Sequence, residues 1–184
     1  MHESDKRDIE EVIHFWFVET TPEQRYAKDS EFDALVKRKF EELYWRVLKG
    51  DTKSWRETSA GRLAEVIVLD QFARNMFRGN KQSFVGDEFA LSLSREAIEM
   101  GDDEKLPQEQ KHYLYMPFMH SESHKVHKEA LKIFEEKSDR NGLDYEIKHK
   151  EIIDRFGRYP HRNKVLERES TPEELEFLKE NSGF

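Results

Sequence analysis

The chain has 184 residues, which is enough for one globular domain of ordinary size and short for two. It contains no cysteine, which excludes disulfide bonds, thiolate zinc sites, iron–sulfur clusters and cysteine nucleophiles. The formal net charge of −8 argues against nonspecific nucleic-acid binding, and no apolar run is long enough for a membrane span. The N-terminus is acidic and does not read as a secretory signal. We therefore expect one soluble, cytoplasmic domain over residues 1–184 that binds neither nucleic acid nor membrane.

The first half of the sequence predicts two amphipathic helices. Residues 5–18 form the first, and the second covers residues 29–50, where apolar residues recur at three- and four-residue steps. Gly50 stands where a left-handed residue would end the second helix. The inner face of the first helix is expected to carry Ile9, Val12, Ile13, Trp16 and Phe17.

The middle of the chain predicts three more helices. One starts near residue 59 and is apolar nearly all round; periodicity alone leaves a buried strand open, but its continuation through Phe72 favours a helix. Another runs from Asp87, which can cap it, to Gly101. A third begins near Pro107 and is expected to end or kink at Pro117.

The C-terminal third predicts three further helices. The first spans about residues 122–137 and stops before the Asn-Gly pair at 141–142, and the second covers 143–156. The last begins at Thr171 and Pro172 with a capping-box sequence. No segment alternates with period two, and the loops look short, so neighbouring helices should be antiparallel. The sequence therefore predicts an all-α domain.

Two windows, residues 71–86 and 155–164, carry Arg and Lys but no Asp or Glu. Like charges gathered in an acidic chain repel one another, so buried carboxylates or an anionic ligand should offset them. If the helix through residue 72 continues, Asp70, Arg74 and Arg78 share one face. Each window can be read either as an anion site or as a set of ion pairs and caps that join helices.

The histidines do not predict a metal site. His120, His124 and His127 can share a helix face, and Glu-x-x-His patterns occur, but with eight His in the chain such matches are expected by chance. His149 lies on an apolar stripe, where a hydrogen-bonded core role is the usual one. We expect no metal and no cofactor.

Three long segments stand out along the chain, Val68–Gly79, Tyr115–Glu122 and Arg155–Asn163, together with the opening Val12–Phe17 and the tail Glu167–Leu178. In this order they resemble DUF924, a family of bacterial proteins of unknown function. The resemblance implies antiparallel helix pairs stacked as in tetratricopeptide-repeat (TPR) proteins, about seven to nine helices in all. The family brings no established reaction.

We expect these segments to converge on a concave polar surface. The ligand-binding candidates are Asp70, Arg74, Asn75, Arg78, Arg155, Arg158, Arg162 and Asn163. The catalytic candidates are His120, Glu122 and His161.

Three functions follow as hypotheses. The first is binding of an anionic small molecule or an acidic peptide. The second is a hydrolase- or transferase-like enzyme that uses His120 or His161 as general acid or base. The third is a structural or protein–protein interaction scaffold whose Arg residues pair with carboxylates.

Overall fold

The computed structural model describes residues 1–181, so the last three residues of the domain predicted over 1–184 lie outside it. The described chain is all-helical and contains no strand, which confirms the predicted fold class. Its contacts divide it into two compact units. Unit 1 comprises residues 1–78 and 82–117, and unit 2 comprises residues 79–81 and the chain from residue 118 onward.

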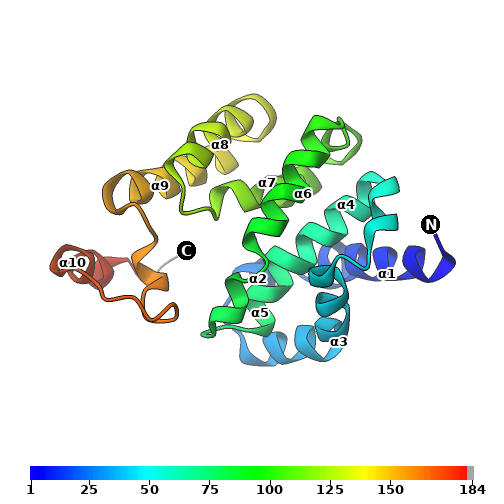
Figure 1. The fold of residues 1–184 in the computed structure, drawn as a ribbon, viewed down its shortest axis with the longest axis horizontal. Coiled ribbons are helices and arrows are strands. Elements are labelled where there is room, and N and C mark those ends of the chain that lie inside the picture. Colours follow the sequence, from blue (N-terminus) through cyan, green and yellow to red (C-terminus); the bar gives the residue numbers. More distant parts are fainter. Residues whose placement is uncertain (182–184) are drawn as a thin grey trace. The chain divides into compact units, whose positions relative to one another are not determined.

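Unit 1 is built from helices that follow one another through short connections (Figure 1). They are α1 (Glu3–His14), α2 (Pro22–Tyr26), α3 (Ser30–Lys49), α4 (Ser59–Val66), α5 (Ala73–Met76), α6 (Asp87–Glu99) and α7 (Gln108–Met119), whose last two residues belong to unit 2. Two π-helical segments lie between them, η1 (Phe15–Glu19) and η3 (Ile67–Phe72). Short 3₁₀ turns complete the unit: η2 (Lys53–Glu57), η4 (Lys81–Phe84), whose first residue belongs to unit 2, and η5 (Asp103–Lys105).

Aromatic rings form the centre of unit 1. Phe72 is fully buried, and its ring centroid lies 4.4 Å from that of Phe40, 5.5 Å from that of Trp16 and 5.8 Å from that of Phe15. The Phe40 pair is stacked and the other two are edge-to-face, and both arrangements contribute to stability beyond the buried area. The apolar stripe of α3 supplies Phe40, as its periodicity predicts.

The ends of α3 are those expected from the sequence. The Asp29 carboxylate accepts hydrogen bonds from the backbone N–H groups of Glu31 and Phe32, and Gly50 adopts the left-handed conformation at φ 78°.

The helix that begins at Ser59 is continuous but changes its winding. It runs as α4, passes through the π-helical η3 and ends in α5 at Met76. The extra residue per turn in a π segment rotates the following side chains relative to an α-helix. Asp70 and Arg74 still form the expected i, i+4 pair. Arg78, however, lies beyond the end of the helix, so the expectation that it shares their helical face is wrong.

Unit 2 consists of an antiparallel helix pair and a C-terminal helix (Figure 1). The pair is α8 (His124–Lys137) and α9 (Arg140–Phe156), followed by the 3₁₀ turn η6 (Pro160–Arg162) and by α10 (Pro172–Glu180). The capping box predicted for α10 is confirmed, since Thr171 accepts from the N–H of Glu174 and Glu174 accepts from that of Thr171.

Three predicted boundaries differ from the structure. α7 continues two residues past Pro117, so this proline does not end the helix. Asp139 caps α9 one turn early, because its carboxylate accepts from the N–H of Gly142, which places the 141–142 pair inside the helix. The N-cap of α6 is Gly86, and Asp87 is the first helical residue.

Candidate functional site

In unit 1, the predicted residues Asp70 and Arg74 belong to a network of charges in which Asp70 is fully buried and Arg74 and Asp87 are partly exposed. The Arg74 guanidinium donates two 3.0 Å hydrogen bonds to the Asp87 carboxylate and lies 3.1 Å from the Asp70 carboxylate. Asp70 is fully buried, and its second oxygen accepts from the side-chain amide of Gln71 at 2.5 Å. The bidentate hydrogen bonds to Asp87 fix the orientation of the Arg74 guanidinium, which in turn orients the Asp70 and Asp87 carboxylates.

The predicted residues Asn75 and Arg78 both bind Asp33 of α3. The Arg78 guanidinium donates to the two carboxylate oxygens at 2.5 and 2.8 Å, and the Asn75 amide donates to one of them at 2.9 Å. The hydrogen bonds that Arg78 donates to Asp33 raise the pKa of Arg78 above its ordinary value. In unit 1 the predicted cations thus contact carboxylates from other helices.

In unit 2, histidine rings surround Tyr159, which lies three residues beyond the end of α9. Its ring centroid lies 5.6 Å from that of His161, 5.8 Å from that of His149 and 6.3 Å from that of His127. The guanidinium of Arg162 stacks on the same ring with its Cζ atom 4.6 Å from the centroid. We call these five residues the Tyr159 cluster.

Burial controls the protonation of one member of this cluster, His149. His149 is buried and its Nδ1 lies 2.8 Å from the carbonyl oxygen of Tyr145, as expected for a core histidine. Burial lowers the pKa of His149 to about 3; the electrostatic effects of His120, His127 and Arg162 act in the same direction, and the hydrogen bond to the Tyr145 carbonyl opposes them. His149 is therefore neutral at physiological pH, with its Nδ1–H donated to the carbonyl.

A fully buried carboxylate, that of Glu146, supports the cluster from α9. Its Oε1 lies 2.8 Å from Nδ1 of His127, whose Nε2 lies 2.8 Å from the Ser121 carbonyl oxygen. The Tyr159 hydroxyl donates to the Met119 carbonyl at 2.6 Å. Burial raises the pKa of Glu146, against the opposing effect of His127. The Tyr159 hydroxyl proton is donated to a backbone carbonyl, which does not pass a proton on. The network therefore fixes the side chains of Tyr159, His127 and Glu146 and does not form a proton-transfer path to solvent.

The catalytic candidate Glu122 is held by hydrogen bonds from Arg168 and from the backbone of Tyr159. Its carboxylate accepts from the Arg168 guanidinium at 2.7 and 2.9 Å and from the Tyr159 backbone N–H at 2.7 Å. Burial alone would raise the pKa of Glu122, but these hydrogen bonds lower it below its ordinary value. His120 and His161 are partly exposed, and the His120 ring lies 6.5 Å from that of His149.

The predicted residues Arg155, Arg158 and Asn163 hold α10. Arg158 donates to both carboxylate oxygens of Glu174 at 2.7 and 2.8 Å, and Asn163 donates to one of them at 3.2 Å. These contacts, the Arg158 hydrogen bond first, lower the pKa of Glu174 to about 2. Arg155 pairs with Glu173 at the surface.

A hollow in unit 2 brings the two acid-poor windows together. It has a volume of about 520 Å³. The first window contributes Gly79, Asn80 and Lys81, and the second contributes Lys164 and the residues just after it, Val165 and Glu167. Lys81 and Lys164 are exposed, and neither forms an ion pair within residues 1–181. Glu167 has a φ of 55°, a conformation that non-glycine residues rarely adopt.

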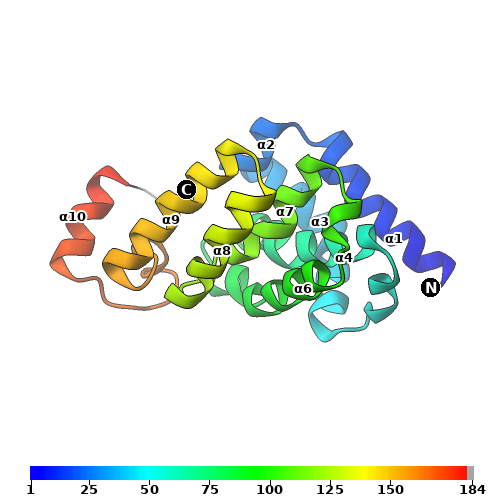
Figure 2. The ribbon, with the colours of Figure 1, turned by 90° about the horizontal axis from the view of Figure 1, so that it is seen from above.

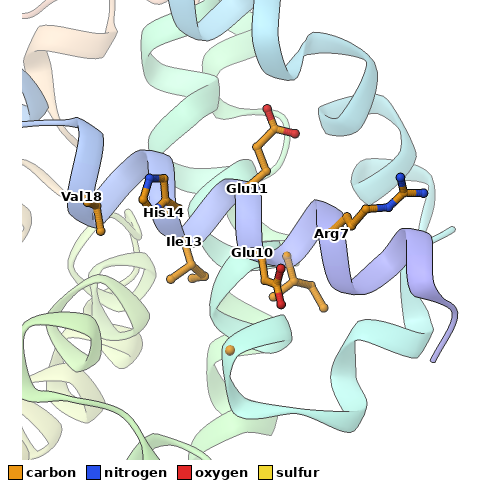
Figure 3. A pocket seen from close by; sticks show the side chains of 8 residues that line it. Arg7, Glu10, Glu11, Ile13, His14 and Val18 are labelled. Carbon is orange, nitrogen blue, oxygen red and sulfur yellow. The ribbon is translucent and has the colours of Figure 1, made fainter.

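A second hollow, of about 630 Å³, lies along α1 and has a mostly apolar lining (Figure 3). Its residues are Arg7, Ile9, Glu10, Glu11, Ile13, His14, Val18 and Ala60. Ile13 and Val18 project from the same side of the helical ribbon, whereas Glu11 projects from the opposite side. No predicted site residue lies here.

The predicted site residues thus fall into one group in each unit. Unit 1 holds Asp70, Arg74, Asn75 and Arg78, and unit 2 holds His120, Glu122, Arg155, Arg158, His161, Arg162 and Asn163. The sequence-based selection missed Lys81, Lys164, Tyr159, Glu146 and His127 as parts of these arrangements. Two signals were available: Lys81 and Lys164 lie in the acid-poor windows, and Tyr159 stands inside a resembling segment.

Comparisons with known proteins identify the relatives of this chain. The model of the family described as "Bacterial protein of unknown function (DUF924)" matches residues 12–182. The chain belongs to this family. A solved structure described as a protein of unknown function from Agrobacterium tumefaciens is 31% identical to this chain, with a TM-score of 0.90 over 96% of this chain and 99% of that one. No curated protein matches. In the described part of this DUF924 chain, no helix is long and apolar enough to span a membrane.

Proposed function

We propose that this DUF924 protein binds an anionic small molecule in the hollow lined by Lys81 and Lys164. The supporting observation is that two acid-poor segments, far apart in the sequence, contribute to one hollow of about 520 Å³. A volume of this size is typical of small-molecule sites. Lysine ammonium groups that lack carboxylate partners attract phosphate or carboxylate groups as point charges.

Other cations of the two acid-poor windows are already engaged within the chain, which leaves Lys81 and Lys164 as candidates for an external anion. Arg74, Arg78 and Arg158 each donate two or more hydrogen bonds to a carboxylate of this chain, so their guanidinium forks are occupied. Arg162 is buried against the Tyr159 ring. Lys81 and Lys164 are exposed and reach solvent at the hollow. Arg162 is two residues before Lys164 and adds positive charge to the same segment.

Isothermal titration calorimetry with inorganic phosphate, pyrophosphate and citrate tests the proposal. We expect saturable binding that weakens with added salt, because the attraction is between exposed charges. Lys81→Ala and Lys164→Ala should each weaken it, whereas Lys132→Ala, an exposed lysine of α8 outside the hollow, should leave it unchanged. Glu167→Gln should tighten binding, by about threefold, because it removes the carboxylate that lines the hollow.

Equal affinities in all four variants, or no saturation with any of the three anions, would reject the proposal. Binding of a glutamate-rich peptide in the absence of binding by these anions would indicate an acidic peptide as the ligand instead.

A second candidate function is acid–base catalysis at His161. The imidazole is partly exposed while its ring contacts the buried Tyr159, so it is both accessible and positioned. If the bound anion is a substrate, His161→Ala should abolish its turnover and leave the affinity within about twofold of the wild type. Unchanged turnover in this variant would exclude His161 as a catalytic residue.

A further inference from the structure

The guanidinium of Arg25, on the short helix α2, lies among three aromatic rings of unit 1. Its Cζ atom is 5.4 Å from the ring centroid of Phe17, 5.7 Å from that of Tyr113 and 5.9 Å from that of Trp16. Trp16 and Tyr113 are buried, so the rings are fixed by the core. Aromatic rings within about 6 Å of a cation attract it through their negative faces, most strongly when water is excluded.

A carboxylate completes this arrangement. The Glu109 side chain, on α7, accepts a 2.6 Å hydrogen bond from Nη1 of Arg25, and the Thr20 carbonyl accepts one of 3.1 Å from Nη2. We call Trp16, Phe17, Tyr113 and Glu109 the aromatic cage. Three rings and an acid form a site for a planar or rounded organic cation.

Arg25 fits the cage incompletely. Its Nε–H is buried and has no hydrogen-bond acceptor, and neither does the indole Nε1–H of Trp16. A buried donor without an acceptor costs about 1–3 kcal/mol. The internal occupant of the cage is therefore less well satisfied than Arg74, which donates two hydrogen bonds to Asp87 and one to the Asp70 carbonyl.

The helix that carries Arg25 is short, and the Arg25 side chain is deeply inserted, at 5% exposure. α2 has five residues, none of them buried as a whole, and lies at the edge of unit 1 (Figure 2). The residues on either side of it, Thr21 and Ala27, have extended backbone conformations, so α2 does not continue into a neighbouring helix. A five-residue helix has little stability of its own and depends on the contacts of its side chains.

We propose that the aromatic cage binds the guanidinium group of an arginine side chain presented by a partner, and that Arg25 occupies the cage until that ligand displaces α2. The ligand class follows from the internal occupant, which is itself a guanidinium at the centre of three rings. The closed position of α2 reduces the apparent affinity by the fraction of molecules in which the cage is open. Removing the Arg25 side chain removes this competition.

Titration with ethylguanidinium, which has the cationic end of an arginine side chain, tests the proposal. In Arg25→Ala we expect a saturable shift of the Trp16 indole N–H signal in NMR spectra, with an affinity about tenfold higher than in the wild type. Adding Phe17→Leu or Glu109→Gln to this variant should weaken the binding. Arg155→Ala is the matched control, because Arg155 also stacks on aromatic rings and pairs with a glutamate, but on an open surface.

Two results would overturn the proposal. One is a folded Arg25→Ala protein whose Trp16 signal does not respond, or responds no more than in the Arg155→Ala control. The other is a result for the wild type, which does not depend on whether the variant folds. The backbone amides of Arg25 and Ala27 are hydrogen-bonded in α2, so we expect their hydrogen exchange to be faster with ethylguanidinium present. Unchanged exchange would mean that the ligand does not displace α2.

Discussion

At the scale of residues, the contacts of Arg74 distinguish between the two interpretations of the first acid-poor window. Its guanidinium contacts two carboxylates, Asp70 and Asp87, which come from different helices. Asp70 is fully buried, so its charge depends on neighbouring donors. At this position the hypothesis of ion pairs that join helices describes the contacts better than that of a site open to an external anion.

Arg74→Ala should destabilise the protein by about 3 kcal/mol, because it removes the guanidinium shared by two carboxylates in a place of low dielectric. Urea denaturation followed by circular dichroism measures the change. Arg140→Ala serves as the control, since the Arg140 side chain is 88% exposed and its pair with Asp144 should contribute less than about 0.5 kcal/mol. Equal effects of the two substitutions would contradict the assigned role.

At the scale of elements, helix α10 depends on one carboxylate. Glu174 is 2% exposed and accepts hydrogen bonds from Arg158, Asn163 and the backbone N–H of Thr171. It therefore serves both as half of the capping box and as the contact between α10 and the segment after α9. The sequence predicts the first role, because the Thr-Pro-Glu-Glu pattern is local, and gives no indication of the second.

Glu174→Gln should destabilise α10 by about 3 kcal/mol at neutral pH, the equivalent of the lowering of its pKa to about 2. A carboxyl group whose pKa is lowered by folding stabilises the folded state above its ordinary pKa near 4.5. This contribution is lost as the pH falls from there toward 2. The difference between wild type and variant should accordingly shrink over that interval.

Amide exchange of α10 at pH 7 and at pH 3 measures this difference. Glu173→Gln is the matched control, because Glu173 is 62% exposed at its side chain and pairs with an exposed arginine. A difference that does not change with pH would show that the Glu174 charge does not hold the helix.

For the whole molecule, the sequence predicts a single domain over residues 1–184, and the contacts within the chain divide it into two compact units. Whether the units unfold as one domain is a question that spectroscopy can answer. All three tryptophans, Trp16, Trp45 and Trp55, belong to unit 1. Tryptophan fluorescence therefore reports on unit 1, whereas far-ultraviolet circular dichroism reports on the helices of both. The two signals can be used to ask whether the units unfold together.

We expect the urea unfolding transitions followed by fluorescence and by circular dichroism to coincide at pH 7, as they do for a single cooperative domain. The physical reason is the chain connectivity: residues 79–81 belong to unit 2 while both flanking segments belong to unit 1, so neither unit is a continuous piece. A second transition seen only by circular dichroism would contradict the single-domain prediction.

The sequence by itself determined the helices, because their causes are local. The stripe and caps of α3 and the capping box of α10 lie within a few residues of the ends they specify. It also pointed to the two acid-poor windows, and the family resemblance is confirmed by the family match over residues 12–182. The sequence did not determine the lengths of α7 and α9. Pro117 lies inside α7, and Asp139 caps α9 before the Asn-Gly pair.

Only the tertiary structure decided which charges meet. Asp33 and Arg78 are 45 residues apart, and Glu122 and Arg168 are 46 apart, so no spacing rule connects them. The same holds for the hollow of Lys81 and Lys164 and for the aromatic cage around Arg25. Local propensity acts over a helical turn, whereas a charge pairs with whatever group the packing of distant helices brings within a few ångströms.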